Sequence, residues 1–138
     1  MDADNKVLEA LSSLGQTEVI QEEVYQKLEE YICSVYLCAP KFKTLKELRW
    51  WFFTKKQVES ISMPPTRAAL RPAIQRAHFQ SLIWQQAHIP RPNLPPVTDF
   101  GWTLSENDRY VPVMCDLPSG PEEVLSIVHC CCGSSKCV

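Results

Sequence analysis

The stretch that decides the fold is PPTRAALRPAIQRAHFQSLIWQQAH, residues 64–88. Thr66 is typical of a helix start, because its hydroxyl can accept a hydrogen bond from an amide of the first turn. Pro72 lies past that turn, where it removes one hydrogen bond and predicts a kink. We expect a helix that ends near His88. Its apolar periodicity predicts one buried stripe, formed by Leu70, Ala73, Ile74, Ala77, Ser81 and Trp84.

Two more helices are predicted at the start of the chain. The first has one apolar face, made by Val7, Leu8, Leu11 and Leu14. The second has one apolar stripe, made by Ile20, Val24, Leu28, Ile32 and Val35. Gly15 is a natural stop between them, Thr17 is the predicted cap of the second helix, and Pro40 forbids its simple continuation. We therefore expect two antiparallel helices joined at Gly15.

A further helix is predicted to begin at Thr44. Thr44-Leu45-Lys46-Glu47 is a capping box, in which a hydroxyl and a carboxylate each satisfy an exposed amide. Its predicted buried face consists of Leu45, Leu48 and Phe52. Trp50, Trp51 and Phe53 spread apolar surface around most of the circumference, so this helix is either enclosed or lies against a partner.

The remainder of the chain predicts little regular structure. Residues 89–96 are proline-rich and extended, and two short strands, 100–102 and 110–114, flank a turn at 105–108. Residues 121–129 predict a short helix. The expected fold is therefore mainly α: a small four-helix domain with a minor β-hairpin, a short C-terminal helix and a cysteine tail. The predicted parts are a helical domain (1–89), a connector (90–99), the hairpin with the short helix (100–129) and the tail (130–138).

Composition places the chain among folded proteins. It has 138 residues, a formal net charge of −2 and 45% hydrophobic residues, which is a globular composition. Residues 1–63 carry eight basic and ten acidic side chains, residues 64–96 four arginines and no acid, and residues 97–138 two basic and six acidic ones. No apolar run is long enough for a signal peptide or a membrane span. We expect an intracellular protein, nuclear or cytoplasmic, with reduced cysteines and no membrane partner.

Four of the seven cysteines lie in the last nine residues. Cys130, Cys132 and Cys137 have the spacing C-x-C-x4-C, and thiolates are suited to tetrahedral zinc. A structural zinc needs four ligands. His129 or Cys131 is the candidate fourth, although each adjoins another ligand. The alternative is an oxidisable tail without metal, so the predicted cofactor is either zinc or none.

Residues 41–56 combine six basic residues and one acid with five aromatics. This pattern is typical of a surface for single-stranded nucleic acid, since cations contact phosphates and rings stack on bases. Lys55 and Lys56 are candidate contacts at its end. The alternative, which the net charge of the whole chain favours, is an amphipathic helix that buries its aromatic rings and leaves its lysines in solvent.

Arg67, Arg71 and Arg76 extend the candidate nucleic-acid surface into the next predicted helix. The guanidinium group suits phosphate geometry. Arg67 and Arg71 lie one turn apart, whereas Arg76 points elsewhere. The alternative is that these arginines pair with acidic residues of the same chain between Asp99 and Glu123.

No arrangement of residues predicts catalysis. Four glycines exclude a Gly-rich phosphate loop, three scattered histidines form no triad, and the acidic residues form no D-x-D or E-x-x-H group. We expect no enzymatic activity.

Several short motifs together resemble one protein family. They are Met63-Pro64-Pro65-Thr66-Arg67-Ala68-Ala69-Leu70, Arg76-Ala77-His78-Phe79-Gln80, Trp84, Pro95, Gly101-Trp102 and the C-x-C cluster, preceded by the segment 46–56. They look like the C-terminal region of large uncharacterised proteins that are abundant in invertebrate and some vertebrate genomes and resemble products of mobile elements. The resemblance covers residues 26–137.

In that family the region usually follows a flap-endonuclease-like or PIN-like nuclease domain. Its cysteine cluster continues into a run that resembles the tesmin-type CXC zinc domain, which binds DNA. The resemblance implies that Cys130, Cys132 and Cys137 match the first part of such a zinc domain. This chain contains no nuclease portion, so none of the nuclease's acidic metal ligands carries over, and the cluster is expected to be incomplete.

The sequence therefore predicts a non-catalytic interaction or accessory module derived from a mobile-element-type protein, with nucleic acid or a protein as its partner. Two alternatives remain open: a zinc-dependent DNA-binding module, and an inactive fragment of a nuclease-containing protein.

Overall fold

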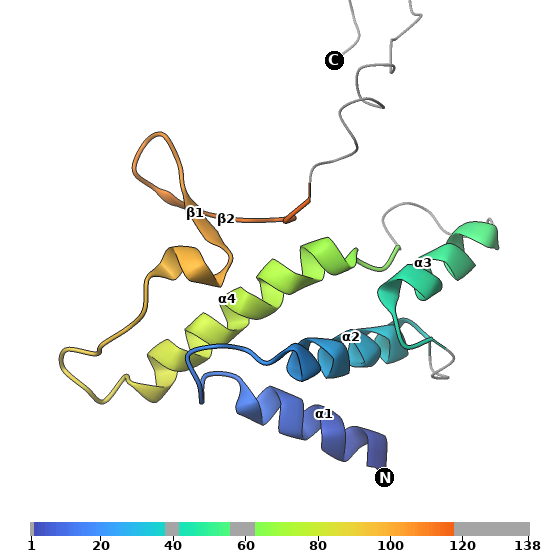
Figure 1. Ribbon diagram of the computed structural model, residues 1–138, viewed down its shortest axis with the longest axis horizontal. Coiled ribbons are helices and arrows are strands. Elements are labelled where there is room, and N and C mark those ends of the chain that lie inside the picture. The colour runs from blue at the N-terminus through green and yellow to red at the C-terminus, as the bar shows by residue number, and fades with distance from the viewer. Residues whose placement is uncertain (1, 38–41, 56–62, 118–138) are drawn as a thin grey trace, which may run out of the picture.

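The computed structural model describes residues 2–37, 42–55 and 63–117. Within these ranges the chain is mainly helical, as predicted, with four α-helices and one two-stranded antiparallel hairpin (Figure 1). The elements are α1 (Asp2–Ser13), α2 (Glu22–Tyr36), α3 (Leu45–Thr54), α4 (Arg67–Gln85), the 3-10 helix η2 (Val97–Phe100), β1 (Trp102–Leu104) and β2 (Tyr110–Pro112). The predicted helix at 121–129 and the cysteine tail lie outside the described residues.

α4 lies at the centre of the fold, between the pair α1–α2 and the segment of η2 and the hairpin (Figure 1). α1 and α2 run antiparallel, and the chain turns between them at Gly15, which has a φ of +83°. The first core cluster, where α1, α2 and α4 meet, consists of Ala10, Tyr25, Leu28 and Ile74. The second, where α3 packs on the end of α2, consists of Cys33, Leu45 and Leu48.

Two of the three predicted helix caps are confirmed. The Thr44 hydroxyl accepts a hydrogen bond from the Glu47 amide at 3.3 Å, and the Thr66 hydroxyl accepts one from the Ala69 amide at 3.1 Å. The predicted Thr17 cap is wrong, because α2 begins only at Glu22. The Thr17 hydroxyl donates instead to a carbonyl two residues later, within the loop.

Three of the predicted apolar stripes are wrong in part. In α2, Val35 is 61% exposed. In α4, Ala77 is exposed and Trp84 is 70% exposed, although both were expected in the core. In α1, Leu8 and Leu11 are exposed as well. α4 is covered by different neighbours on two sides, so its buried surface does not follow a single stripe. The buried residues of α4 are Pro72, Ile74, His78 and Leu82.

Pro72 is buried inside α4, which continues through it as one helix. Because proline has no amide hydrogen, the carbonyl of Ala68, four residues earlier, lacks its usual partner. That carbonyl accepts a hydrogen bond from the Asp116 amide, with an N–O distance of 3.1 Å. Gly101 packs on the same turn, where a Cβ atom would lie 2.6 Å from the Pro72 carbonyl oxygen. Pro72 therefore leaves a free carbonyl on α4, at Ala68, to which the segment after the hairpin binds through Asp116.

The predicted hairpin is confirmed, with strands slightly different in extent. Thr103 pairs with Val111 at the centre of the two strands. The turn closes where the Ser105 amide donates to the Arg109 carbonyl at 2.8 Å. None of the described helices is long and apolar enough to cross a bilayer.

Candidate functional site

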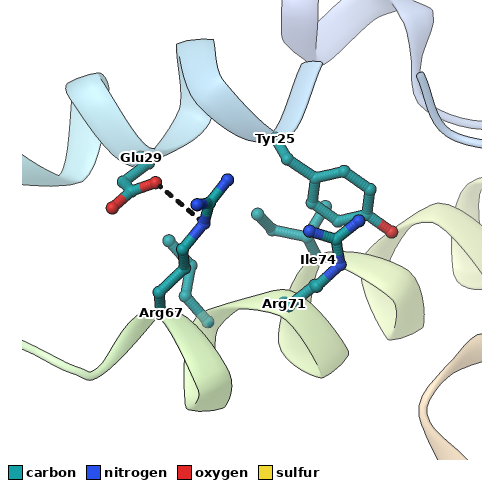
Figure 2. Close-up of a pocket in the computed structure, with 6 residues that line it drawn as sticks. Tyr25, Glu29, Arg67, Arg71 and Ile74 are labelled. Atoms are coloured by element: carbon teal, nitrogen blue, oxygen red, sulfur yellow. Dashed lines mark ion pairs between the residues drawn. The ribbon is translucent and has the colours of Figure 1, made fainter. Parts of the chain in front are cut away.

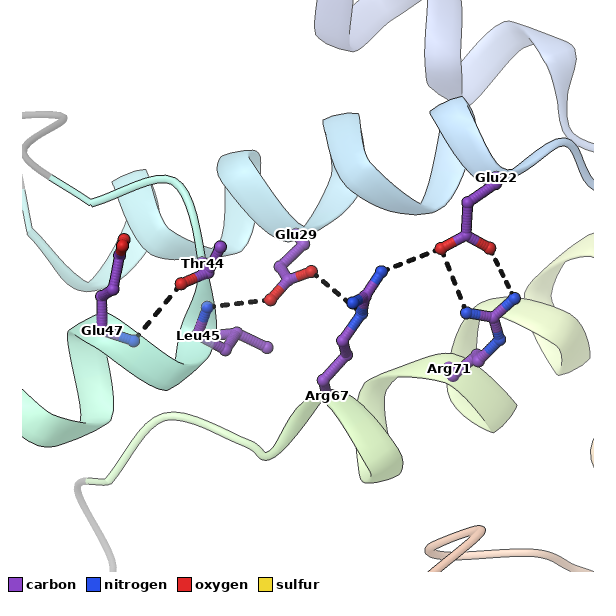
Figure 3. Close-up of polar contacts among 7 residues, drawn as sticks. All are labelled: Glu22, Glu29, Thr44, Leu45, Glu47, Arg67 and Arg71. Carbon is purple, nitrogen blue, oxygen red and sulfur yellow. Dashed lines mark hydrogen bonds and ion pairs between the residues drawn. The ribbon is translucent and has the colours of Figure 1, made fainter.

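Glu29 is a buried carboxylate at the meeting point of α2, α3 and α4 (Figure 3). Its Oε1 accepts a hydrogen bond from the amide of Leu45, the first residue of α3, at 2.9 Å. Its Oε2 lies 3.3 Å from Nε of Arg67, the first residue of α4. A carboxylate is favourable beside a helix N-terminus, because the free amides there carry partial positive charge. Glu29 thus holds the starts of two helices together.

Arg67 and Arg71 share a second carboxylate, that of Glu22. Arg67 Nη2 lies 2.8 Å from Glu22 Oε1, and Arg71 Nη2 lies 2.6 Å from Glu22 Oε2 (Figure 3). The hydrogen bond from Arg71 lowers the pKa of the Glu22 carboxyl, an effect strengthened by the positive charge of both guanidinium groups. The Arg71 guanidinium also stacks over the Tyr25 ring, 4.3 Å from its centroid (Figure 2).

The space enclosed by these side chains is too small for a ligand. Figure 2 shows the guanidinium groups of Arg67 and Arg71 filling the gap between Glu29 and the Tyr25 ring. The free volume is about 10 Å³, which is room for about one water molecule. The pocket is therefore part of the polar packing between α2 and α4.

Arg76 binds the protein's own backbone. Its Nη1 donates to the Val113 carbonyl at 2.6 Å and to the Gly101 carbonyl at 3.2 Å. The Val113 amide in turn donates to the Gly101 carbonyl at 2.9 Å. Arg76 therefore holds the residues just before and just after the hairpin, Gly101 and Val113, against α4.

The three predicted nucleic-acid arginines thus do not form one open basic surface. Arg67 and Arg71 face α2, Arg76 faces the hairpin, and each is engaged within the chain. This matches the alternative that the arginines pair within the chain. Their partners, however, are not the acidic residues between Asp99 and Glu123 that the sequence suggested. In the part of the chain that the structure describes, the ion pairs of these arginines run to α2, at Glu22 and Glu29.

α3 presents a different surface, on which aromatic and basic side chains lie together in solvent. Trp50 is 67% exposed and Phe53 is 68% exposed. Their rings stack, with centroids 6.0 Å apart and planes at 28°. Lys46, also exposed, lies one turn before Trp50 on the same face of the helix. We call the residues Lys46, Trp50 and Phe53 the α3 face.

The opposite side of α3 is firmly packed, so the α3 face has a rigid support. Leu45 and Leu48 are fully buried, and Phe52 meets Tyr36 of α2 edge to face with ring centroids 6.5 Å apart. The Arg49 guanidinium donates to the Pro64 carbonyl just before α4. The expectation that α3 buries its aromatic rings therefore holds for one side of the helix only.

Lys55, which follows the last residue of α3, is the one member of the predicted nucleic-acid set that adjoins this helix among the described residues. Its ammonium sits over the Trp51 ring, 5.8 Å from the centroid, and its side chain is exposed. Lys43, at the other end of α3, is exposed as well. Lys56 lies outside the described residues. Sequence reasoning singled out the segment but not its outward residues, although the spacing 46, 50 and 53 already places them on one face.

The predicted zinc ligands, Cys130, Cys132, Cys137 and His129, lie outside the described residues, and the zinc site stays a prediction. Within the described ranges no cluster of three potential metal ligands is present. Cys33 is buried in the second core cluster, where desolvation raises the pKa of its thiol to about 11 and leaves it protonated.

His78 is a buried polar residue that sequence reasoning did not single out. It is 1% exposed, and its Nδ1 accepts a hydrogen bond from the Gly15 amide at 3.0 Å. The ring stacks on Phe100 of η2, with centroids 5.8 Å apart. Burial lowers the pKa of His78, and the carbonyls of Thr17 and Glu18 offset this in part. His78 thus connects the α1–α2 turn, α4 and η2.

No protein-family model, curated protein or solved structure matches this chain.

Proposed function

We propose that this chain is a non-catalytic binding module that engages single-stranded nucleic acid through the α3 face. The observation that carries the proposal is the stacked Trp50–Phe53 pair, which is two-thirds exposed beside Lys46 on a well-anchored helix. Adjacent exposed aromatic rings are typical of recognition surfaces, where Trp and Tyr are enriched. An exposed ring pair beside an ammonium group suits a partner with flat apolar faces and regular negative charge.

Single-stranded nucleic acid has both properties. Its unpaired bases stack on aromatic side chains with about 1–3 kcal/mol per base, while its phosphates attract Lys and Arg. In a duplex the base faces are hidden inside the stack, so the rings of Trp50 and Phe53 would find no partner there. The local charge is favourable, since residues 42–55 carry four basic side chains and one acid.

Fluorescence anisotropy with a labelled oligothymidylate of about 15 nucleotides tests the proposal on the full chain. Trp50→Ala and Phe53→Ala should each weaken binding about 5- to 150-fold, the equivalent of losing one stacked base. Tyr110→Ala is the matched control, because Tyr110 is an aromatic residue that is also exposed but lies on β2. Trp50, Phe53 and Tyr110 are all solvent-exposed, so the variants should keep the urea midpoint of the parent chain.

The salt dependence of the affinity for nucleic acid is an independent test. Lys43, Lys46 and Lys55 together predict a slope of log K against log salt of about −2, because each neutralised phosphate of a single strand contributes about −0.7. A duplex of the same length should compete poorly. No binding at low salt, or an equal loss in Trp50→Ala and Tyr110→Ala, would contradict the proposal.

The cysteine tail supports a second candidate, a zinc-dependent DNA-binding module, which rests on the C-x-C-x4-C spacing of residues 130–137. Binding that is lost with a chelator and in Cys132→Ser, but is unchanged in Trp50→Ala, would favour this candidate over the α3 face. Derivation from a mobile-element-type protein, including an inactive nuclease fragment, rests on the motif resemblance and is proposed on that ground alone.

A further inference from the structure

Among the described residues, a second surface without a packing partner lies on α4, away from the hairpin, and it is apolar. α1, α2 and α4 enclose an open groove of about 250 Å³ whose walls include Leu11, Leu28, Tyr31, Leu70, Ala73 and Ala77. Leu8, one turn before the groove on α1, and Val35, one turn beyond it on α2, are 62% and 61% exposed. They extend the apolar surface at both ends.

A tryptophan projects from the same surface. Trp84 follows Ala77 by seven residues, which is two helical turns, and so it shares a face of α4 with Ala77 and the groove. The outer face of α4 carries no charge, since it consists of Ala69, Ala73, Ala77, Gln80 and Trp84. These residues include half of the stripe that the periodicity of the sequence placed in the core.

The size of the surface calls for a macromolecular partner. The exposed parts of the large apolar side chains around the groove amount to on the order of 500 Å², at the upper end of what a monomer exposes in one patch. With the groove walls added, it reaches the lower end of specific interfaces, to which each partner contributes about 600 Å².

We propose that this surface is self-complementary, and that two copies of the chain pack α4 against α4 in antiparallel orientation about a twofold axis near Ala77. In that arrangement Trp84 of one copy faces Leu70 of the second copy, because the two residues lie seven positions on either side of Ala77. Seven residues span about 10 Å along a helix, so each Trp84 reaches the groove of the other copy.

The groove has the capacity that this arrangement requires. A cavity of about 150 Å³ accommodates a benzene ring, and the groove of about 250 Å³ has room for an indole. A second copy fits better than a different protein, because the projecting ring and the groove are equidistant from one point on the helix. The small alanine side chains of this face let the helices approach, and the absence of charge on it removes the repulsion between like surfaces.

Sedimentation equilibrium of the full chain with a thiol reductant, at about 100 µM and without nucleic acid, tests the proposal. The expected mass is twice the 15.8 kDa of one chain. Trp84→Ala should weaken the dimer at least about 10-fold, and Ala77→Arg, which places a charge on the twofold axis, should give monomers. Trp50→Ala is the matched control and should remain dimeric. If Trp84→Ala monomers still bind nucleic acid, the dimer surface and the α3 face act independently.

Three outcomes would overturn the proposal. One is a wild-type monomer at this concentration. Another is a dimer that neither Trp84→Ala nor Ala77→Arg weakens. The last is a monomer in which Trp84→Ala lowers the urea midpoint, because Trp84 would then be covered by residues of its own chain outside the described ranges.

Discussion

Replacing Glu29 tests the account of how the starts of α3 and α4 are held against α2. Glu29→Ala removes the acceptor of the Leu45 amide, and Leu45 is fully buried, so the amide is left without a partner. An unpaired buried donor costs about 1–3 kcal/mol, and the attraction of the carboxylate for two helix starts is lost as well. We expect the free energy of unfolding to fall by about 2–4 kcal/mol.

Glu29→Gln separates the two contributions. The amide oxygen of Gln can still accept from the Leu45 amide, so the orphaned donor is avoided. What is lost is the charge beside Arg67 and the helix N-terminus, and because Arg67 is 53% exposed, solvent screens much of that attraction. We expect a loss of about 1 kcal/mol. Glu30→Gln is the control: Glu30 is exposed on the same helix, so its change should stay within about 0.5 kcal/mol.

Urea unfolding followed by far-ultraviolet circular dichroism measures these differences. With a slope of about 2 kcal/mol/M, the midpoint of Glu29→Ala should fall by about 1–2 M at unchanged slope. A midpoint for Glu29→Ala as high as that of Glu30→Gln would refute the central role of the carboxylate. If Glu29→Ala and Glu29→Gln lose equal amounts of unfolding free energy, the hydrogen bond to the Leu45 amide does not supply the larger share of the stabilisation by Glu29.

Three further perturbations probe the packing around α4. The pKa of His78 is lower in the folded protein than in the unfolded chain, where it is about 6.5. As the pH falls, the unfolded chain therefore binds a proton before the folded one does, which destabilises the fold. The urea midpoint should drop between about pH 7.5 and 5.5, and His78→Phe should flatten that drop. Gly101→Ala should cost at least about 2 kcal/mol in thermal unfolding, because the residue has a φ of +74° and its Cβ would lie 2.6 Å from the Pro72 carbonyl oxygen. Pro72→Ala supplies an amide that competes for the Ala68 carbonyl, so hydrogen exchange of the Asp116 amide should become faster; unchanged exchange would contradict the docking role of that carbonyl.

The helix starts could be predicted because each depends on a few neighbouring residues. Thr44 and Thr66 cap α3 and α4 through hydrogen bonds to amides three residues later, and such contacts are visible in a short stretch of sequence. Thr17 has the same chemistry but does not cap α2. Its hydroxyl is engaged within the loop, and α2 begins after Gln21 without a side-chain cap.

The candidate site was found only as a segment. The alternation of basic and aromatic residues in 41–56 pointed to α3, but the sequence favoured burial of the rings. The structure instead leaves Trp50 and Phe53 in solvent, because the packing partners of α3 cover only the side formed by Leu45, Leu48 and Phe52. Which side of an all-round apolar helix is covered depends on its neighbours and not on its own periodicity.

The sequence by itself determined the helical class, the starts of α3 and α4, the turn at Gly15 and the hairpin, since all of these rest on contacts between near neighbours. Only the tertiary structure decided the partners of the arginines, the buried side of α4 and the role of Pro72. Arg67 and Glu22 are 45 positions apart, and His78 and Gly15 are 63 positions apart. Contacts between such distant residues arise from how the helices pack, which no local pattern encodes.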